Sequence, residues 1–242
     1  SFTRKDILKF IESNYDTGQM VLSSVGNISI NKLIKLFDRY FGHIPQKSIP
    51  LKHISYSDYV PVFRENNYNT YQSHCIIGNV AYNIKDEKRF TLNLLNNVLG
   101  GPGLNSRLSM SLREKNGFVY NIDSTYTPYS DTGVISIYFG TDKSDIDISI
   151  KTVLKELKKL KTKQLTDSQL LKAKRQILGQ IAISLESNEN LMLSMGKSYL
   201  IFNKVDSLEE ISRKYNAISA KELQDVANDL FSKEKLSYLI YK

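Results

Sequence analysis

Histidine, cysteine and acidic side chains are the residue types best suited to hold a metal ion, but their spacing here does not favour a metal site. None of the three histidines, His43, His53 and His74, has a second ligand at the spacing of a zinc motif. Neither H-x-x-E-H nor H-E-x-x-H occurs in the chain. His74 and Cys75 are neighbours in a predicted strand, where successive side chains point to opposite faces. We therefore expect no catalytic metal to bind to this chain.

The usual patterns of nucleophilic catalysis and of nucleotide binding are also missing. Cys75 lies in an apolar run, which favours packing as a small hydrophobic side chain over attack on a substrate. No G-x-S-x-G elbow presents a serine nucleophile. The run Gly101-Pro102-Gly103 follows a predicted helix and lacks the G-K-[ST] ending of a phosphate loop. These glycines favour a turn or a close backbone approach instead.

The most informative part of the sequence extends from Leu99 to Tyr120. It contains a glycine-rich turn, a Ser-Arg-Leu run and an Arg-Glu-Lys-x-Gly-x-x-Tyr run, which are Leu99-Gly100-Gly101-Pro102-Gly103, Ser106-Arg107-Leu108 and Arg113-Glu114-Lys115-Asn116-Gly117-Phe118-Val119-Tyr120. In type and order these runs closely resemble the second domain of the M16 zinc peptidases, the pitrilysin or inverzincin family. Other runs similar to that family extend the resemblance over nearly the whole chain: Val25-Gly26-Asn27, Tyr40-Phe41-Gly42, Tyr129-Ser130-Asp131-Thr132-Gly133, Lys172-Ala173-Lys174, Leu185-Glu186-Ser187 and Ile218-Ser219-Ala220-Lys221-Glu222-Leu223.

This resemblance implies roles for particular residues. In M16 peptidases one domain holds zinc through H-x-x-E-H and a later glutamate, so the resemblance implies zinc in a partner domain and no cofactor in this chain. In that family the domain without zinc, which this chain resembles, supplies an Arg and a Tyr that reach the substrate, and the matching residues here are Arg113 and Tyr120. Both side chains can donate hydrogen bonds to a peptide carbonyl and to a developing oxyanion. Gly100, Gly101 and Gly103 are implied to form a loop near the substrate. The alternative for the pair is structural, a surface Arg in a salt bridge and a half-buried Tyr ring.

Hydrophobic periodicity predicts helices and strands that together form an α+β fold. Helices are expected at 3–13, 29–42, 86–98, 106–115, 144–160, 166–186, 190–202, 207–215 and 219–231, and strands at 20–25, 71–80, 119–127, 133–140 and 236–241. A hydroxyl followed three residues later by a carboxylate begins the first and the last helix, at Thr3 with Asp6 and at Ser219 with Glu222. The closing helix and strand therefore repeat the opening pair. This repeat marks a duplicated unit or is a chance likeness, because the pattern is common.

The domain organisation follows from this pattern and from the resemblance. We expect an α+β domain of the M16 type, with a mainly antiparallel sheet layered against several helices. Residues 45–65 contain prolines and no sustained period, which is typical of a linker. Residues 1–44 are then the C-terminal tail of the preceding M16 domain, and residues 66–242 are the substrate-clamping domain without zinc. The opening at a helix start favours a shortened chain, and a naturally short chain is the alternative.

The net charge of the chain, and where the basic residues lie, indicate which classes of partner to expect. A formal net charge of +8 is compatible with a nucleic-acid surface, an anionic membrane surface or acidic substrates. The densest basic stretch, residues 151–163, alternates lysines with apolar residues at helical spacing, which predicts a solvated helix face. We therefore expect no nucleic-acid partner. No run of about 18 apolar residues occurs, so no membrane span is expected.

The sequence thus predicts the non-catalytic half of a zinc-dependent M16 metallopeptidase, inactive by itself. Its expected role is to complete the substrate chamber and to bind extended peptide at a sheet edge. The expected partners are a zinc-bearing M16 domain, in the same chain or on another, and the peptide substrate. The alternative is a catalytically inactive, M16-like structural subunit that holds partners together. The presence of both Arg113 and Tyr120 favours the peptidase.

Overall fold

The structure is a computed structural model, which describes residues 1–50, 54, 56–68 and 70–242. The α-helices are α1 (Arg4–Asn14), α2 (Ile30–Phe41), α3 (Lys88–Gly100), α4 (Ile146–Thr162), α5 (Asp167–Leu185), α6 (Asn188–Phe202), α7 (Leu208–Ala217) and α8 (Ala220–Leu230). The strands are β1 (Phe63–Asn66), β2 (Ser73–Ala81), β3 (Val119–Pro128), β4 (Gly133–Thr141) and β5 (Ser237–Tyr241). Shorter segments are η1 (Thr17–Gln19), the π-helical η2 (Ser109–Glu114), η3 (Lys143–Asp145) and η4 (Lys233–Lys235).

The chain divides into two compact units, which we call the first and the second unit. The first unit comprises Ser1–Ile54 and Gln180–Glu210. The second unit comprises Ser55–Gly179 and Ile211–Lys242. The division of the chain into an M16 tail, a linker and a C-terminal domain remains a prediction.

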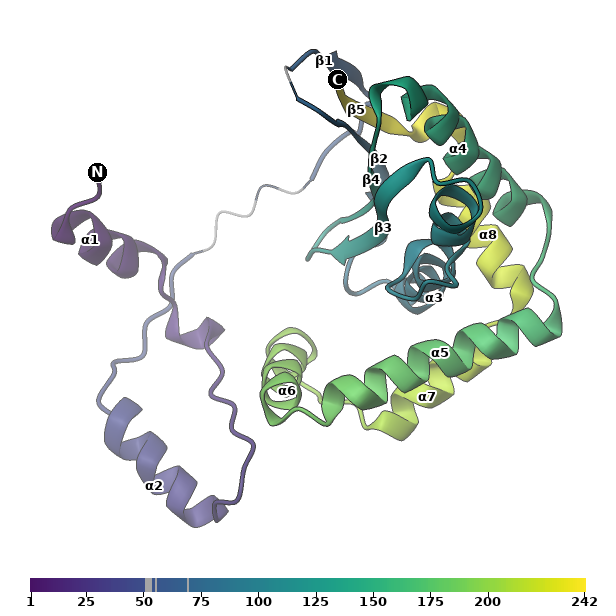
Figure 1. The fold of residues 1–242 in the computed structure, drawn as a ribbon. Coiled ribbons are helices and arrows are strands. Elements are labelled where there is room, and N and C mark those ends of the chain that lie inside the picture. Colours follow the sequence, from purple (N-terminus) through teal and green to yellow (C-terminus); the bar gives the residue numbers. More distant parts are fainter. Residues whose placement is uncertain (51–53, 55, 69) are drawn as a thin grey trace. The chain divides into compact units, whose positions relative to one another are not determined.

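A five-stranded sheet organises the second unit (Figure 1). The strand order is β1-β5-β2-β4-β3. β1 pairs with β5 in parallel, whereas β2 with β4, β2 with β5 and β3 with β4 are antiparallel pairs. The expected α+β fold with a mainly antiparallel sheet is therefore confirmed.

Helices α3, α4 and α8 cover one face of this sheet (Figure 1). Alternate strand residues point toward them: Cys75 and Ile77 of β2 and Ile135 and Ile137 of β4 are at most 2% exposed. The helices contribute further buried side chains to this core, among them Leu92, Leu95, Leu99, Val153, Leu157, Leu223 and Val226. This alternation is typical of an antiparallel sheet with one covered face.

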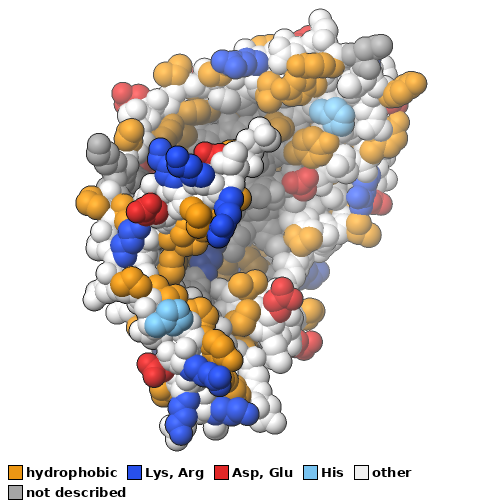
Figure 2. Space-filling model, turned by 90° about the vertical axis from the view of Figure 1, so that its left-hand side faces the viewer, with side chains coloured by type: hydrophobic (Ala, Val, Ile, Leu, Met, Phe, Trp, Pro, Cys, Tyr) orange, Lys and Arg blue, Asp and Glu red, His pale blue; other side chains and the backbone are white. Residues whose placement is uncertain are grey.

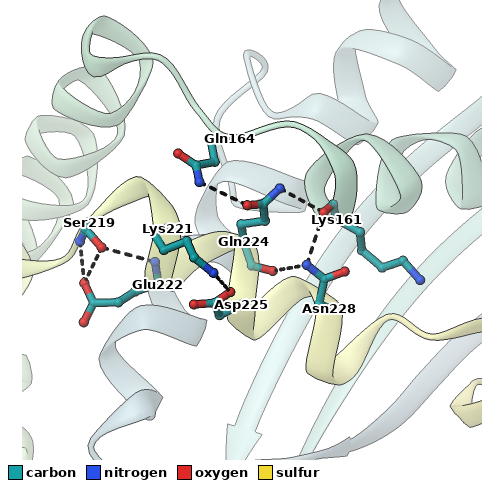
Figure 3. A network of polar contacts seen from close by, with 8 residues as sticks. All are labelled: Lys161, Gln164, Ser219, Lys221, Glu222, Gln224, Asp225 and Asn228. Carbon is teal, nitrogen blue, oxygen red and sulfur yellow. Dashed lines mark hydrogen bonds and ion pairs between the residues drawn. The ribbon is translucent and has the colours of Figure 1, made fainter.

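Helix α8 is fixed at both its start and its middle by polar contacts. It begins with a capping box, in which Ser219 Oγ accepts from Glu222 N at 3.2 Å and Ser219 N donates to Glu222 Oε2 at 2.6 Å. Gln224 Nε2 and Asn228 Nδ2 both donate to Lys161 O, at 3.0 and 3.1 Å (Figure 3). Because the last carbonyls of a helix have no partner within it, these amides attach the end of α4 to α8.

Strand β1 lies partly within the segment predicted to be a linker. All four of its residues are exposed, and they pair with residues 238–241 of β5. Tyr238 N donates to Val62 O at 2.8 Å, and the Phe63 and Tyr238 rings are 5.9 Å apart. No local pattern predicts this strand, because it is short, exposed and paired with the far end of the chain. Residues 51–53 and 55 of the predicted linker, His53 included, lie outside the described residues.

The first unit contains α1, α2 and α6, and none of these helices has a buried residue. The Asp16 carboxylate joins the loop after α1 to a later segment, since it accepts from Gly18 N at 2.8 Å and from Ile49 N at 3.0 Å. Hydrophobic side chains are exposed on the surface, as the face in Figure 2 illustrates. Those of the first unit include Phe2, Ile7, Leu8, Phe10, Met20, Leu22, Ile30, Ile34 and Tyr40.

The strand predicted at residues 20–25 is wrong, because these residues form neither strand nor helix. A strand needs a neighbour that pairs with its backbone, and none of the described residues pairs with this run in a ladder. Ser23 Oγ instead donates to Met192 O at 2.8 Å. The other predicted helices and strands are present with somewhat different ends, and the helix expected at 106–115 is π-helical from Ser109 to Glu114.

Candidate functional site

A polar pocket lies in the second unit between the end of α3, the segment η2 and strand β3. Its volume is about 370 Å³, and Gly100, Gly101 and Arg113 all line it. The other lining residues are Asn93, Asn96, Asn97, Pro102, Leu104, Ser109, Ile122, Asp123, Ser124 and Thr125. Amide, hydroxyl and guanidinium groups dominate this lining, so the polar pocket is rich in hydrogen-bond donors.

Helix α3 and strand β3 come into very close contact at Gly100. A Cβ atom on Gly100 would lie 2.7 Å from Ser124 Cβ and 2.8 Å from Ser124 N. Asn96 Nδ2 donates to Ser124 O at 2.9 Å, and Asn96 Oδ1 accepts from Ser124 Oγ at 2.6 Å. Both side chains are buried, so each satisfies the other. A glycine is therefore required at position 100 for this wall of the pocket to form.

Arg113 comes from the π-helical segment η2. Lys115 N donates to Met110 O at 3.2 Å, which is the i to i−5 bond of a π-helix. The segment ends at Glu114, and Gly117, shortly after it, has a φ of 63° in the left-handed region that glycine favours. The backbone turns here, since Gly117 N donates to Arg113 O at 2.9 Å. π-Helical turns occur frequently at functional sites.

Several N–H groups of the Arg113 guanidinium make no hydrogen bond within the described residues. Its Nε donates to Glu114 Oε1 at 2.9 Å. An ion pair of this exposed kind contributes about 0–1 kcal/mol, so it does not hold the side chain firmly. No other hydrogen bond of the Arg113 side chain is recorded within the described ranges. Since a guanidinium carries five N–H donors, the terminal nitrogens can bind a ligand in the polar pocket.

Tyr120 lies near the start of β3 and is exposed. Its hydroxyl donates to Asp142 Oδ1 at 3.0 Å. This hydrogen bond, together with the Asp142 charge, raises the pKa of Tyr120. The phenol is therefore protonated at neutral pH and acts as a donor.

The structure brings together part of the predicted site. Gly100, Gly101 and Arg113 line the polar pocket, whereas Gly103 and Tyr120 are not among its lining residues. A Cβ atom on Gly103 would meet the side chain of Asn105, outside that lining. The roles predicted for all five positions stay predictions.

Comparison with known proteins identifies the family. The family model described as "Peptidase M16 inactive domain" matches residues 1–177. The chain belongs to this family. This M16 chain is 29% identical over 240 residues to the uncharacterized zinc protease YmxG of Bacillus subtilis (strain 168), covering 99% of this chain and 58% of that protein. It is 26% identical over 245 residues to the mitochondrial-processing peptidase subunit beta of Saccharomyces cerevisiae, covering 94% of this chain and 53% of that protein.

A solved structure shares the fold of the M16 chain. The structure of a peptidase M16 inactive domain from Pseudomonas fluorescens matches with a TM-score of 0.86 and 20% identity, covering 99% of this chain and 57% of that one. The chain thus spans a little over half the length of the proteins that it matches. The M16 membership predicted from the sequence is confirmed.

The described part of the M16 chain does not fit a zinc ion. Within it, no group of three or more His, Cys, Asp or Glu residues could hold a metal. His74 Nδ1 shares a hydrogen bond of 2.9 Å with Tyr138 OH, and Cys75 is fully buried, which raises the pKa of its thiol to about 12. His53 lies outside the described residues. Among the described helices, none has the length and apolarity to cross a bilayer.

Sequence reasoning missed the asparagines of the polar pocket. Asn93, Asn96 and Asn97 line it. They recur at i, i+3 and i+4 in an otherwise apolar helix, a spacing that places them on one face. This polar stripe was the available signal. Ser124 offered none, because only tertiary packing brings it against Gly100.

Proposed function

We propose that this M16 chain is the non-catalytic half of a zinc metallopeptidase, in which it completes the substrate chamber and binds the peptide. The zinc-bearing M16 domain lies upstream in the same polypeptide or on a second one. The observation that carries this proposal is the polar pocket, which Arg113 lines together with Gly100 and Gly101. The zinc protease and processing-peptidase names of the relatives support it.

Arg113 and Tyr120 are the proposed peptide-binding residues. The terminal nitrogens of Arg113 donate to a peptide carbonyl oxygen at the polar pocket. The Tyr120 hydroxyl, which now donates to Asp142, exchanges this acceptor for a peptide oxygen, so the number of its hydrogen bonds is unchanged. Zinc in the partner domain supplies the activation of water.

The same two donors stabilise the transition state. As a carbonyl carbon is attacked, its oxygen gains negative charge, and hydrogen bonds from a guanidinium and a phenol to that oxygen strengthen. Loss of one such donor costs about 100-fold to 1,000-fold in kcat in enzymes of known mechanism. Neither residue takes part in bond breaking, so the chain is inactive by itself.

The edge strand β3 offers a place for an extended peptide. β3 is the last strand of the sheet, and Ile122, Asp123, Ser124 and Thr125 line the polar pocket. A peptide that pairs with β3 therefore lies beside Arg113. Ser124 O already accepts a hydrogen bond from Asn96 Nδ2. A peptide can therefore pair only with the parts of β3 on either side of Ser124.

Residues 1–44 are proposed to be the tail of the preceding M16 domain. Their apolar side chains on α1, on α2 and in the run 20–25 are largely exposed. An exposed apolar surface of this extent is unusual for a free monomer. A sheet edge of the preceding domain gives the run 20–25 the pairing partner that it lacks here.

Peptide hydrolysis by the chain alone, and by the chain mixed with its zinc-bearing partner domain, tests the proposal. We expect activity only in the mixture. Arg113→Ala lowers kcat by about 100-fold or more, and Tyr120→Phe lowers it by a smaller factor. The matched controls are Arg213→Ala on α7 and Tyr129→Phe in the hairpin turn, both exposed residues, and neither changes kcat.

A mixture that is assembled and loaded with zinc but hydrolyses no peptide would favour the structural subunit. If the mixture is active and Arg113→Ala has the same kcat as Arg213→Ala, the role proposed for Arg113 is overturned. Assembly is therefore measured in parallel by size-exclusion chromatography, because a variant that fails to assemble says nothing about Arg113 itself.

A further inference from the structure

A second, smaller pocket lies between the end of α3, residues 105–107 and α5, entirely within the second unit. Its volume is about 200 Å³, and Asn97 lines both this pocket and the polar pocket. The two pockets are therefore neighbours at the end of α3. Sites for drug-sized ligands measure about 300–1,000 Å³, so this one fits a single chemical group of a larger ligand. We call it the cationic pocket.

The charged residues of the cationic pocket are both basic. Arg107 and Lys172 line it, and no carboxylate of the described residues does. Burial lowers the pKa of Arg107, and the charge of Glu156 opposes this effect. Glu156 is itself ion-paired with Lys159 Nζ at 2.6 Å. In the described ranges no hydrogen bond or ion pair joins the Arg107 guanidinium to another residue.

Two neutral side chains of the cationic pocket, both glutamines, have amide N–H groups that can donate to a ligand. Gln176 Oε1 accepts from Asn105 Nδ2 at 2.9 Å, and Gln169 Oε1 accepts from Thr166 N at 3.0 Å. Each glutamine oxygen is therefore engaged, which leaves the Nε2 groups to donate. Gln169 and Gln176 both line the pocket. A ligand that enters it meets donors, which suits an acceptor such as an anion.

Ser106 points to the same ligand chemistry independently. It lines the cationic pocket and is 3% exposed. Its hydroxyl has no hydrogen-bond partner among the described residues. Buried polar groups in folded proteins are almost always paired. A ligand oxygen in the pocket supplies the missing partner.

We propose that the cationic pocket binds a carboxylate of the peptide substrate, either an acidic side chain or a free C-terminus. This proposal rests on the proposed function, since the peptide that lies in the polar pocket reaches the neighbouring pocket past Asn97. The planar fork of Arg107 matches a carboxylate, and Lys172, Ser106 and the glutamine amides complete the donor set. The net charge of +8 also favours anionic peptides.

Direct binding to the 242-residue chain tests this proposal. Fluorescence anisotropy compares three labelled peptides of otherwise identical sequence: an amidated peptide with one Glu, the same peptide with Gln, and the Gln peptide with a free C-terminus. We expect the Glu peptide or the free-acid peptide to bind about tenfold or more tightly than the amidated Gln peptide. Which of the two gains affinity identifies the source of the carboxylate.

Variants assign the preference to the pocket. Arg107→Gln and Lys172→Gln remove the preference for the carboxylate peptide and leave the affinity for the amidated Gln peptide unchanged. Lys151→Gln, on the exposed face of α4, is the matched control and retains the preference. Ser106→Ala reduces it by a smaller factor. Because Lys172 is exposed, its variant keeps the test valid if Arg107→Gln does not fold.

The outcomes separate this proposal from the proposed function. If all three peptides bind equally and Arg113→Ala weakens them all, the carboxylate pocket is overturned and the peptide-binding role stands. If the carboxylate preference depends on Arg107 but no peptide responds to Arg113→Ala, the pocket stands and the role of Arg113 is overturned. If none of the peptides binds, or if Lys151→Gln and Lys172→Gln have the same effect, the carboxylate pocket is overturned.

Discussion

The opening and the closing segments of the chain share one local plan, a capped helix followed by an apolar run. Both α1 and α8 begin with a complete capping box, from Thr3 with Asp6 and from Ser219 with Glu222. After α8 the apolar run forms β5, which pairs with β1 and β2. After α1 the corresponding run, residues 20–25, forms no strand.

The difference lies in what surrounds each segment. Leu223 of α8 is 2% exposed, whereas Leu8 of α1 is 54% exposed. A capping box fixes where a helix begins because it satisfies the first backbone N–H groups. It does not give the helix a surface to pack against, and most helical stability comes from such packing. The comparison therefore separates local signals, which both segments carry, from tertiary burial, which only α8 has.

Truncation of one leucine in each helix should give the largest contrast. Leu223→Ala leaves a cavity between α8 and the sheet and should lower the free energy of unfolding by about 2–5 kcal/mol. Leu8→Ala should change it by no more than about 0.5 kcal/mol, because the side chain is largely exposed. Urea unfolding followed by circular dichroism measures both values. Equal losses in the two variants would mean that the apolar side of α1 is covered in solution.

Removal of the two cap hydroxyls should give a smaller contrast. Ser219→Ala should lower the free energy of unfolding of the second unit by about 0.5–2 kcal/mol. Thr3→Ala should leave that value unchanged and only fray the first turn of α1, since α1 has no buried residue. Global unfolding and hydrogen exchange at the first residues of each helix distinguish the two effects. If Thr3→Ala lowers the free energy of unfolding of the second unit, then α1 is coupled to that unit and this prediction is wrong.

Local sequence patterns correctly predicted strands that also have pairing partners in the structure. The alternation of Ile135 and Ile137 with Val134 and Ser136 marks β4, and the structure pairs β4 on both sides. The exposed β1 carries no such alternation, because its pairing depends on β5 at the other end of the chain. The strand at 20–25 failed for the opposite reason, since its pattern is clear and its partner is missing from the described residues.

The part of the candidate site that could be predicted lies in the sequence runs that resemble the M16 family. The runs that contain Gly100, Gly101 and Arg113 indicated the residues that line the polar pocket. The asparagine stripe on α3 and the role of Ser124 depend on how α3 lies against β3, which no local pattern encodes. Tyr120, which does not line the pocket, lies at an irregularity in the pairing of β3 with β4 between Val119 and Asn121, and no local pattern predicts this irregularity.

The smallest expected difference between α1 and α8 is in how their capping boxes make the free energy of unfolding depend on pH. The hydroxyl and backbone N–H of Ser219 lower the pKa of Glu222 in the folded state, below the value of about 4.3 in an unfolded chain. The cap carboxylate therefore contributes its full stability above the unfolded pKa, and this contribution is lost as the pH falls through the lower, folded pKa.

Urea unfolding of Glu222→Gln at about pH 6 and about pH 3 measures this contribution. The unmodified chain should lose more stability between the two values than the variant does, because only a carboxylate responds to acid. Asp6, whose pKa is lowered by its hydrogen bond with Thr3, is the matched group in α1. Asp6→Asn should leave the global pH dependence unchanged, since the cap of an unburied helix is not coupled to unfolding of the sheet. If both variants flatten the acid response equally, the two helices unfold together and the contrast between the opening and closing segments fails.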